Sequence, residues 1–221
     1  MSSETRAPPR VRDGVRAALP LALGPLVFGL SFGVLADAVG MGTVAATAMS
    51  ATTFAGSAQY GAVSVLDAGG TIVAAIMAAV FLNARYIAIS VTVASIFPGG
   101  RARRLAESQM IVDESWALSG RSGRFEWPIL VGSGLLIYVL WVGSTALGTV
   151  LGGALGDPNG LGLDAAFAAL FLALLVPYLR GRRAIQAAVL AAVITLMLTP
   201  VTPAGVPIVA AAAACLVGLK R

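Results

Sequence analysis

The sequence predicts an all-α fold, a polytopic bundle of six to seven transmembrane helices whose second segment is broken or re-entrant. A single integral membrane domain would occupy residues 1–221. Of the 221 residues, 58% are hydrophobic and only 11% are charged, whereas a soluble domain carries about 25% charged residues. Such a chain cannot cover itself with a polar surface in water, so soluble enzymes, secreted modules and disordered linkers are excluded.

The composition also limits the available chemistry. The chain has no histidine and one cysteine, Cys215. These absences remove histidine-based catalysis and most zinc sites, and they leave nothing to form an intrachain disulfide. There is no P-loop and no dinucleotide-binding fingerprint. We therefore expect neither an enzyme nor a bound metal or other cofactor.

Apolar runs of bilayer length divide the chain. A spanning helix needs about 20 mostly apolar residues, and Gly and Pro clusters separate the runs. The candidate runs cover 17–36, 43–66, 71–97, 128–155, 161–179, 184–199 and 204–219.

The first run follows a basic tail over residues 1–16. It ends in Ala36-Asp37-Ala38, which resembles a signal-peptide cleavage site. The run is long and many others follow it, so we expect it to remain as the first span. Gly24 and Pro25 within it predict a break or kink in the helix.

All but one of the 15 basic residues lie in four clusters: the tail, the 98–127 loop, residues 180–183 and the chain end. The positive-inside rule assigns all four clusters to the cytoplasm. We therefore expect a multi-pass protein with a cytoplasmic N-terminus. Orientation and contact with anionic lipids account for the pI near 10.1, so no nucleic-acid partner is needed.

An even number of crossings must separate any two cytoplasmic clusters. Three runs lie between the tail and the 98–127 loop, so one of them does not cross completely. The run 43–66 is the weakest, because Thr, Ser and Gln residues interrupt it. We predict that it enters and leaves on the outer side, which gives six full spans. Seven full spans remain the alternative.

A polar motif, Phe54-Ala-Gly-Ser-Ala-Gln-Tyr60, lies inside this run. Gly56 permits a helix break, and Ser57, Gln59 and Tyr60 offer hydrogen-bonding groups. Discontinuous helices in transporters hold charged substrates in this manner. Helix packing through small residues and interhelical hydrogen bonds is the alternative explanation.

Arg85 is the one basic residue outside the clusters, and it lies near the middle of the run 71–97. A central arginine costs about 2.5–3.5 kcal/mol on insertion scales, so it must face a partner or a cavity. A guanidinium can bind a substrate carboxylate with two hydrogen bonds, and Asn83 and Tyr86 add hydrogen-bonding capacity beside it. A purely structural ion pair is the alternative.

Asp113 and Glu114 are the only adjacent carboxylates, and they lie in the 98–127 loop. They could counter Arg85, bind a substrate ammonium group or carry a proton. Alternatively, they form a solvated pair that the arginines of the loop neutralise.

In this order the segments resemble the AzlC family of branched-chain amino acid transporters. The resemblance is carried by Gly24-Pro25-Leu26, Phe54–Tyr60, Asn83–Tyr86, Asp113-Glu114, Trp141–Gly148 and Pro203–Ile208. It implies a prokaryotic inner-membrane permease that exports valine, leucine and isoleucine, with methionine as a further candidate, driven by the proton motive force. It also implies a small AzlD-type membrane protein as partner.

The resemblance does not assign individual side chains to substrate or proton, although it strengthens the case for the acidic pair. A passive channel for small neutral solutes and a structural subunit without transport remain alternatives. The candidate residues fall into three groups: Ser57, Gln59, Tyr60, Asn83 and Arg85 for substrate binding, Asp113 and Glu114 for coupling or gating, and Gly24, Pro25 and Gly56 for helix breaks.

Overall fold

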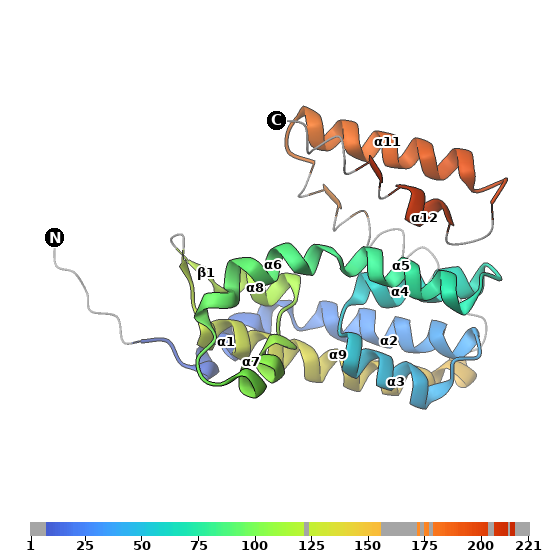
Figure 1. Cartoon of the computed structure of the whole chain (residues 1–221). Helices are drawn as coiled ribbons and strands as arrows, with labels where there is room; N and C mark the ends of the chain where they lie inside the picture. The colour runs from blue at the N-terminus through green and yellow to red at the C-terminus, as the bar shows by residue number, and fades with distance from the viewer. Residues whose placement is uncertain are drawn as a thin grey trace.

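The computed structural model describes residues 8–121, 124–155, 172, 175–176, 179–202, 206–211 and 213–214. Most of this part is helical, as predicted (Figure 1). One short hairpin is the exception, in which β1 (Gly120–Arg121) pairs with antiparallel β2 (Arg124–Phe125). Much of the predicted runs 161–179 and 204–219 lies outside the described residues.

Within the described residues, two helices are long and apolar enough to cross a membrane: Ile72–Ile96 and Trp127–Gly152. A bent pair, Val11–Leu21 with Leu23–Ala38, would make a third. The predicted count of six to seven spans is therefore not confirmed. The run 184–199 does form a helix, α11 (Arg182–Leu198), of 17 residues. It packs against the short α12 (Val206–Ala211).

The bend in the first run lies just before Pro25. Helix α1 (Val11–Ala18) continues into the 3-10 turn η1 (Leu19–Leu21), and α2 (Leu23–Ala38) then leaves at an angle of 68°. Pro25 is the third residue of α2, where its missing N–H costs the helix no hydrogen bond.

Helix α2 packs along α9 (Trp127–Leu155), and the two helices run in the same direction. A Cβ atom at Gly29 or Gly33 would collide with the α9 backbone, and one at Gly148 would collide with Leu30. The glycines therefore allow a close approach that no larger residue permits.

The run 43–66 is divided into two helices of 12 residues each, α3 (Gly42–Thr53) and α4 (Gly56–Asp67). Phe54 and Ala55 separate them, and Phe54 adopts a left-handed conformation with φ of 41°. The chain turns back at this break, so that α4 returns towards the end from which α3 started (Figure 1). Accordingly, Met41 and Leu66 line the same apolar groove.

The run 71–97 forms one helix of spanning length, which a single turn residue interrupts at a place where the sequence has neither Gly nor Pro. Helix α5 (Ile72–Asn83) ends at Ala84, and α6 (Arg85–Val93) follows, with η2 (Ala94–Ile96) at its end. The Ala84 N–H bonds to the Phe81 carbonyl, which marks a tightened turn. Arg85 is consequently the first residue of α6.

The 98–127 loop is folded against the bundle. It contains α7 (Arg101–Ser108) and α8 (Asp113–Ser119). Gln109 donates hydrogen bonds to the carbonyls of Ala51 and Thr52, at 3.2 and 2.9 Å. The Trp116 indole donates to Thr92 at 2.9 Å. These contacts bring the start of α8 beneath the break between α3 and α4.

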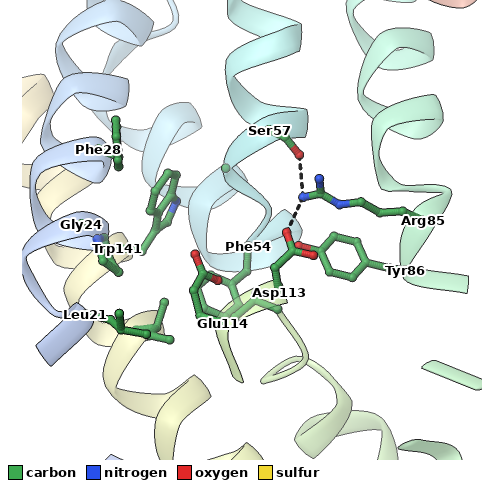
Figure 2. A pocket seen from close by; sticks show the side chains of 14 residues that line it. Leu21, Gly24, Phe28, Phe54, Ser57, Arg85, Tyr86, Asp113, Glu114 and Trp141 are labelled. Carbon is green, nitrogen blue, oxygen red and sulfur yellow. Dashed lines mark hydrogen bonds and ion pairs between the residues drawn. The ribbon is translucent and has the colours of Figure 1, made fainter. Parts of the chain in front are cut away.

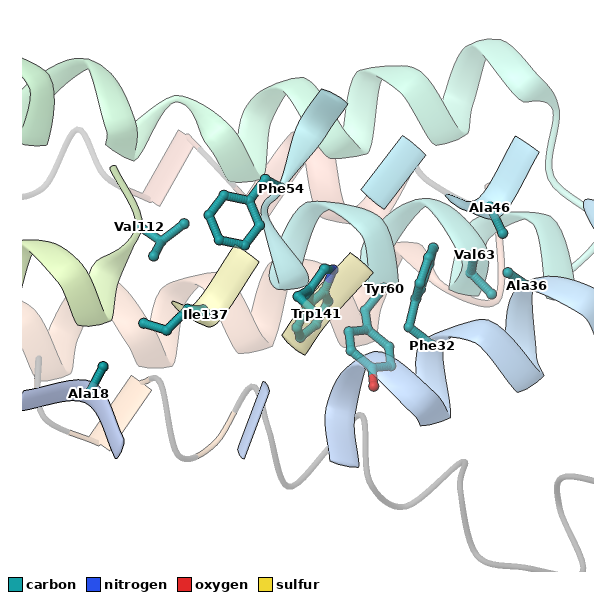
Figure 3. Close-up of a cluster of buried hydrophobic side chains, with 10 residues drawn as sticks. All are labelled: Ala18, Phe32, Ala36, Ala46, Phe54, Tyr60, Val63, Val112, Ile137 and Trp141. Carbon is teal, nitrogen blue, oxygen red and sulfur yellow. The ribbon is translucent and has the colours of Figure 1, made fainter. Parts of the chain in front are cut away.

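The centre of the core is an aromatic cluster between α2, α4 and α9 (Figure 3). The Tyr60 ring lies edge-on to Phe32 and to Trp141, with centroid distances of 5.8 and 6.3 Å. This cluster supports the helix break from the side opposite to α6.

Candidate functional site

A cavity of about 210 Å³ lies at the break between α3 and α4, and α2, α6, α8 and α9 also contribute to its wall. Its polar lining comes from Ser57, Arg85, Tyr86, Asp113 and Glu114. Its other lining residues are Leu21, Gly24, Pro25, Phe28, Phe54, Gly56, Val112, Ile137 and Trp141. Drug-sized ligands need about 300–1,000 Å³, so this volume suits a smaller molecule.

An ion pair crosses one side of the cavity (Figure 2). The Arg85 Nη2 atom lies 2.7 Å from the Asp113 Oδ2 atom, and it donates a hydrogen bond of 2.9 Å to the Ser57 Oγ atom. The guanidinium carbon also lies 5.2 Å from the centroid of the Tyr86 ring. Three segments far apart in the sequence therefore meet at one charged centre.

The ion pair is only partly shielded from solvent, since the exposed fractions of the Arg85 and Asp113 side chains are 32% and 21%. The Asp113 Oδ1 atom is buried, and within the described part of the chain it has no hydrogen-bond partner. The ion pair itself borders the cavity and is therefore partly accessible to a ligand there.

Both acidic side chains bind protons more tightly than free carboxylic acids. Burial raises the pKa of Asp113, and the nearby Arg85 charge opposes this effect without cancelling it. Burial also raises the pKa of Glu114, and the negative charge of Asp113 raises it further. Part of the Glu114 side chain is exposed at the cavity. The surrounding protein nevertheless removes enough water from the carboxyl group to make its neutral form more favourable than in a free glutamate. The pKa of each carboxyl is therefore raised from its ordinary value, with burial as the main cause.

The other side of the cavity is apolar and well fixed. The Trp141 indole donates to the Gln59 Oε1 atom at 2.9 Å, which sets the orientation of the ring. A Cβ atom at Gly56 would lie only 2.9 Å from that ring. Gly56 therefore lets Trp141 lie directly against the first turn of α4.

Gln59 lies outside the cavity lining and is fully buried. Its Nε2 atom donates to Ser50 at 2.7 Å, and Ser50 shares a hydrogen bond of 2.9 Å with Thr145. The Ala55 N–H donates to the Gln59 Oε1 atom at 3.3 Å. Gln59 thus connects the helix break to both α3 and α9.

Tyr60 and Asn83 also lie outside the cavity lining. The Tyr60 hydroxyl donates to the Phe28 carbonyl at 2.5 Å. Asn83 borders a separate apolar groove of about 610 Å³ between α3, α4 and α5. Among the candidate residues, the cavity brings together Gly24, Pro25, Gly56, Ser57, Arg85, Asp113 and Glu114.

Several cavity residues were not predicted as part of the site, but helical spacing could have indicated them. Leu21 and Phe28 lie three residues before and four residues after the predicted Gly24, around the start of α2. Ile137 and Trp141 are four residues apart on α9, which also puts them on one face. Phe54 has no comparable signal, because its position depends on the helix break.

Groups that could hold a metal ion, with three or more His, Cys, Asp or Glu side chains, do not occur in the described ranges. The chemical groups of the cavity are one guanidinium, two carboxylates, hydroxyls and apolar side chains. They can bind opposite charges and exchange protons.

This fold and this site define a class: helical membrane proteins that enclose a small cavity with a charged side and an apolar side. Within that class the chain belongs to the AzlC family, because the family model described as AzlC protein matches residues 20–155. The predicted family membership is confirmed. All of the cavity residues fall within the matched range.

Relatives support the same assignment. A membrane protein of Archaeoglobus fulgidus described as uncharacterized is 33% identical over 209 residues, which cover 92% of this chain and 91% of the relative. The branched-chain amino acid transport protein AzlC of Bacillus subtilis is 24% identical over 172 residues, 75% of this chain and 66% of the relative. No solved structure matches the chain.

Proposed function

We propose that this chain is the large subunit of a secondary transporter that exports branched-chain amino acids across a prokaryotic inner membrane. The substrates would be valine, leucine and isoleucine, with methionine as a further candidate. One observation carries the proposal: the cavity combines a guanidinium, two carboxylates and an apolar wall in about 210 Å³. A zwitterion with an aliphatic side chain has the complementary groups.

In this proposal the substrate carboxylate binds at Arg85 and Ser57. A guanidinium carries five N–H donors, which suits it to carboxylates. The first turn of α4 begins at Gly56 and Ser57, and its N–H groups have no partners within the helix. The positive end of the α4 dipole therefore adds to the attraction of Arg85.

The substrate ammonium group binds at the acidic pair. Asp113 holds Arg85 in place, and Glu114 lies on the next position of the same cavity wall. Glu114 can be neutralised either by the ammonium group or by a proton, but not by both. This mutual exclusion gives proton–substrate exchange, in which entry of a proton drives export of the amino acid.

The membrane arrangement that we propose follows the charge pattern. The N-terminus and the 98–127 loop lie in the cytoplasm, and α3 with α4 forms a re-entrant pair that opens to the outside. This gives six full spans. A small AzlD-type protein is the proposed partner, and anionic lipids contact the basic clusters.

The decisive experiment uses inside-out vesicles that contain the chain and its small partner. An acidic interior should drive accumulation of valine above its external concentration, because proton exit is coupled to valine entry. A passive channel would only equilibrate valine whatever the pH gradient, and a structural subunit would give no uptake. Either result would reject the proposed exchange.

A further inference from the structure

We propose that Gly24 is the residue that sets the size of the substrate side chain. This inference rests on the proposed function, since it takes the cavity as the amino acid site. It names the part of the cavity that receives the aliphatic group. It also names a position where adding atoms would reduce that space directly.

The orientation of the substrate follows from where the charges lie. Figure 2 shows Ser57, Arg85 and Asp113 gathered on one side, while Gly24 and Phe28 lie on the other side of Trp141. The α-carbon of the substrate carries both charges and must stay near the ion pair. Its side chain is therefore directed towards α2, where the lining is apolar.

Gly24 differs from the other α2 glycines that face neighbouring helices. A Cβ atom at Gly29 or Gly33 would collide with α9, so those positions are fixed by packing. At Gly24 an added Cβ would meet nothing within 4 Å. Gly24 also borders the cavity, so in this proposal the added Cβ occupies cavity space.

Backbone conformation does not require a glycine here either. Gly24 is the second residue of α2, and it is absent from the glycines with positive φ. Alanine would favour the helix more than glycine does. The missing side chain therefore has one local consequence, which is a wider apolar end of the cavity.

The Gly24→Ala variant should then shift selectivity towards smaller side chains. One methylene in an apolar pocket changes discrimination by about 10–200-fold. We expect the ratio of valine to leucine transport to rise by roughly tenfold, at the lower end of that range, because the cavity is partly open. Gly24→Val should exclude leucine further and slow valine as well.

The test measures initial rates for valine and leucine in vesicles that hold the chain with its small partner. Gly143→Ala is the matched control, because Gly143 lies on α9 away from the cavity and a Cβ there also meets nothing within 4 Å. A raised valine-to-leucine ratio in Gly24→Ala alone supports the inference. An unchanged ratio overturns it, and so does an equal loss of both substrates.

Two further outcomes are informative. If wild-type vesicles transport neither amino acid, the proposed function itself fails, and this result is obtained before any variant is compared. If Gly24→Ala does not fold, judged by size-exclusion elution and thermal unfolding beside Gly143→Ala, the open space at Gly24 does not exist. That outcome also overturns the inference.

Discussion

At the scale of single residues, Arg85 contributes both to the stability of the site and to its capacity to bind a ligand. A charge inside an apolar run must be compensated, and Asp113 does so at 2.7 Å. Because the pair is partly exposed, breaking it should cost less than the 3–5 kcal/mol of a fully buried pair. The same partial exposure leaves the guanidinium within reach of a ligand.

Replacing Arg85 by alanine is expected to lower valine transport by roughly tenfold or more, since a charged hydrogen bond contributes about 1.5–3 kcal/mol. The double variant Arg85→Ala with Asp113→Asn removes the unpaired carboxylate. It should recover thermal stability but not transport. Arg101→Ala, at an exposed position on α7, serves as control. Full activity in the single variant would leave Arg85 with a structural role only.

Glu114→Gln is expected to uncouple transport from pH. Because its pKa is raised, wild-type Glu114 takes up a proton at a pH above the ordinary glutamate value of about 4.3. The proton-bound form is therefore favoured as pH falls through this raised value, and the ammonium-binding form as pH rises. The variant should still exchange labelled for unlabelled valine without responding to a pH gradient.

Vesicle assays with imposed gradients between pH 5 and 8 would measure this difference. The control is Asp67→Asn, the same chemical change at an exposed residue outside the cavity. A Glu114→Gln protein that still accumulates valine against its gradient would exclude Glu114 as the coupling group.

At the scale of elements, the break between α3 and α4 is held by buried hydrogen bonds. Gln59 bonds to Ser50 and Trp141, and it receives the Ala55 N–H. Each of these partners is buried. The network therefore fixes both the helix break and the orientation of one cavity wall.

Gln59→Ala should destabilise this element, because each buried group left without a partner costs about 1–3 kcal/mol. We expect a lower unfolding temperature, weaker transport and altered substrate preference as Trp141 loses its anchor. The Trp141 indole N–H also loses its hydrogen-bond acceptor, so its fluorescence should shift as well. Gln186→Ala changes an exposed residue of α11 and should leave all four properties unchanged. Normal stability in Gln59→Ala would show that the network contributes little.

The sequence predicted this region through its charges together with its polar side chains. The crossing count indicated that one of the first three runs does not cross completely, and the Thr, Ser and Gln residues selected 43–66. The chain breaks there at Phe54 and Ala55. Residue type alone could not tell whether Gln59 faces a cavity or another helix, since both environments accept an amide. Likewise, the tightened turn at Ala84 has no local Gly or Pro that could have predicted it.

At the scale of the whole molecule, α1 and α2 both pack against α9. Helix α2 runs parallel to α9 as far as Asp37, which lies against Gly152. Helix α1 is bent from α2 by 68° and contacts the start of α9, where Gly14 lies against Ile129. The exposed side chains of α5 include Ile72, Val73 and Val80, which suits contact with lipid. The sequence predicted the membrane class from composition, but the span count depends on residues outside the described part.

Cysteine labelling would test the proposed orientation. Single cysteines at Thr43 and Asp67, both exposed, should react with a membrane-impermeant maleimide added from outside. The background carries Cys215→Ser. A cysteine at the exposed Ala106 of the 98–127 loop should react only after permeabilisation. Labelling of Thr43 and Asp67 positions from opposite sides would require a full crossing by 43–66.

The hydrogen bonds of Gln109 have a mechanical consequence for the molecule. They connect the segment between α7 and α8 to the C-terminal end of α3. The Arg85–Asp113 ion pair connects α8 to α6. The loop is thus attached to both α3 and α6, and the Trp116–Thr92 hydrogen bond is a further contact with α6. A movement of the loop that opened the cavity on this side would therefore have to break its contacts with α3 and with α6.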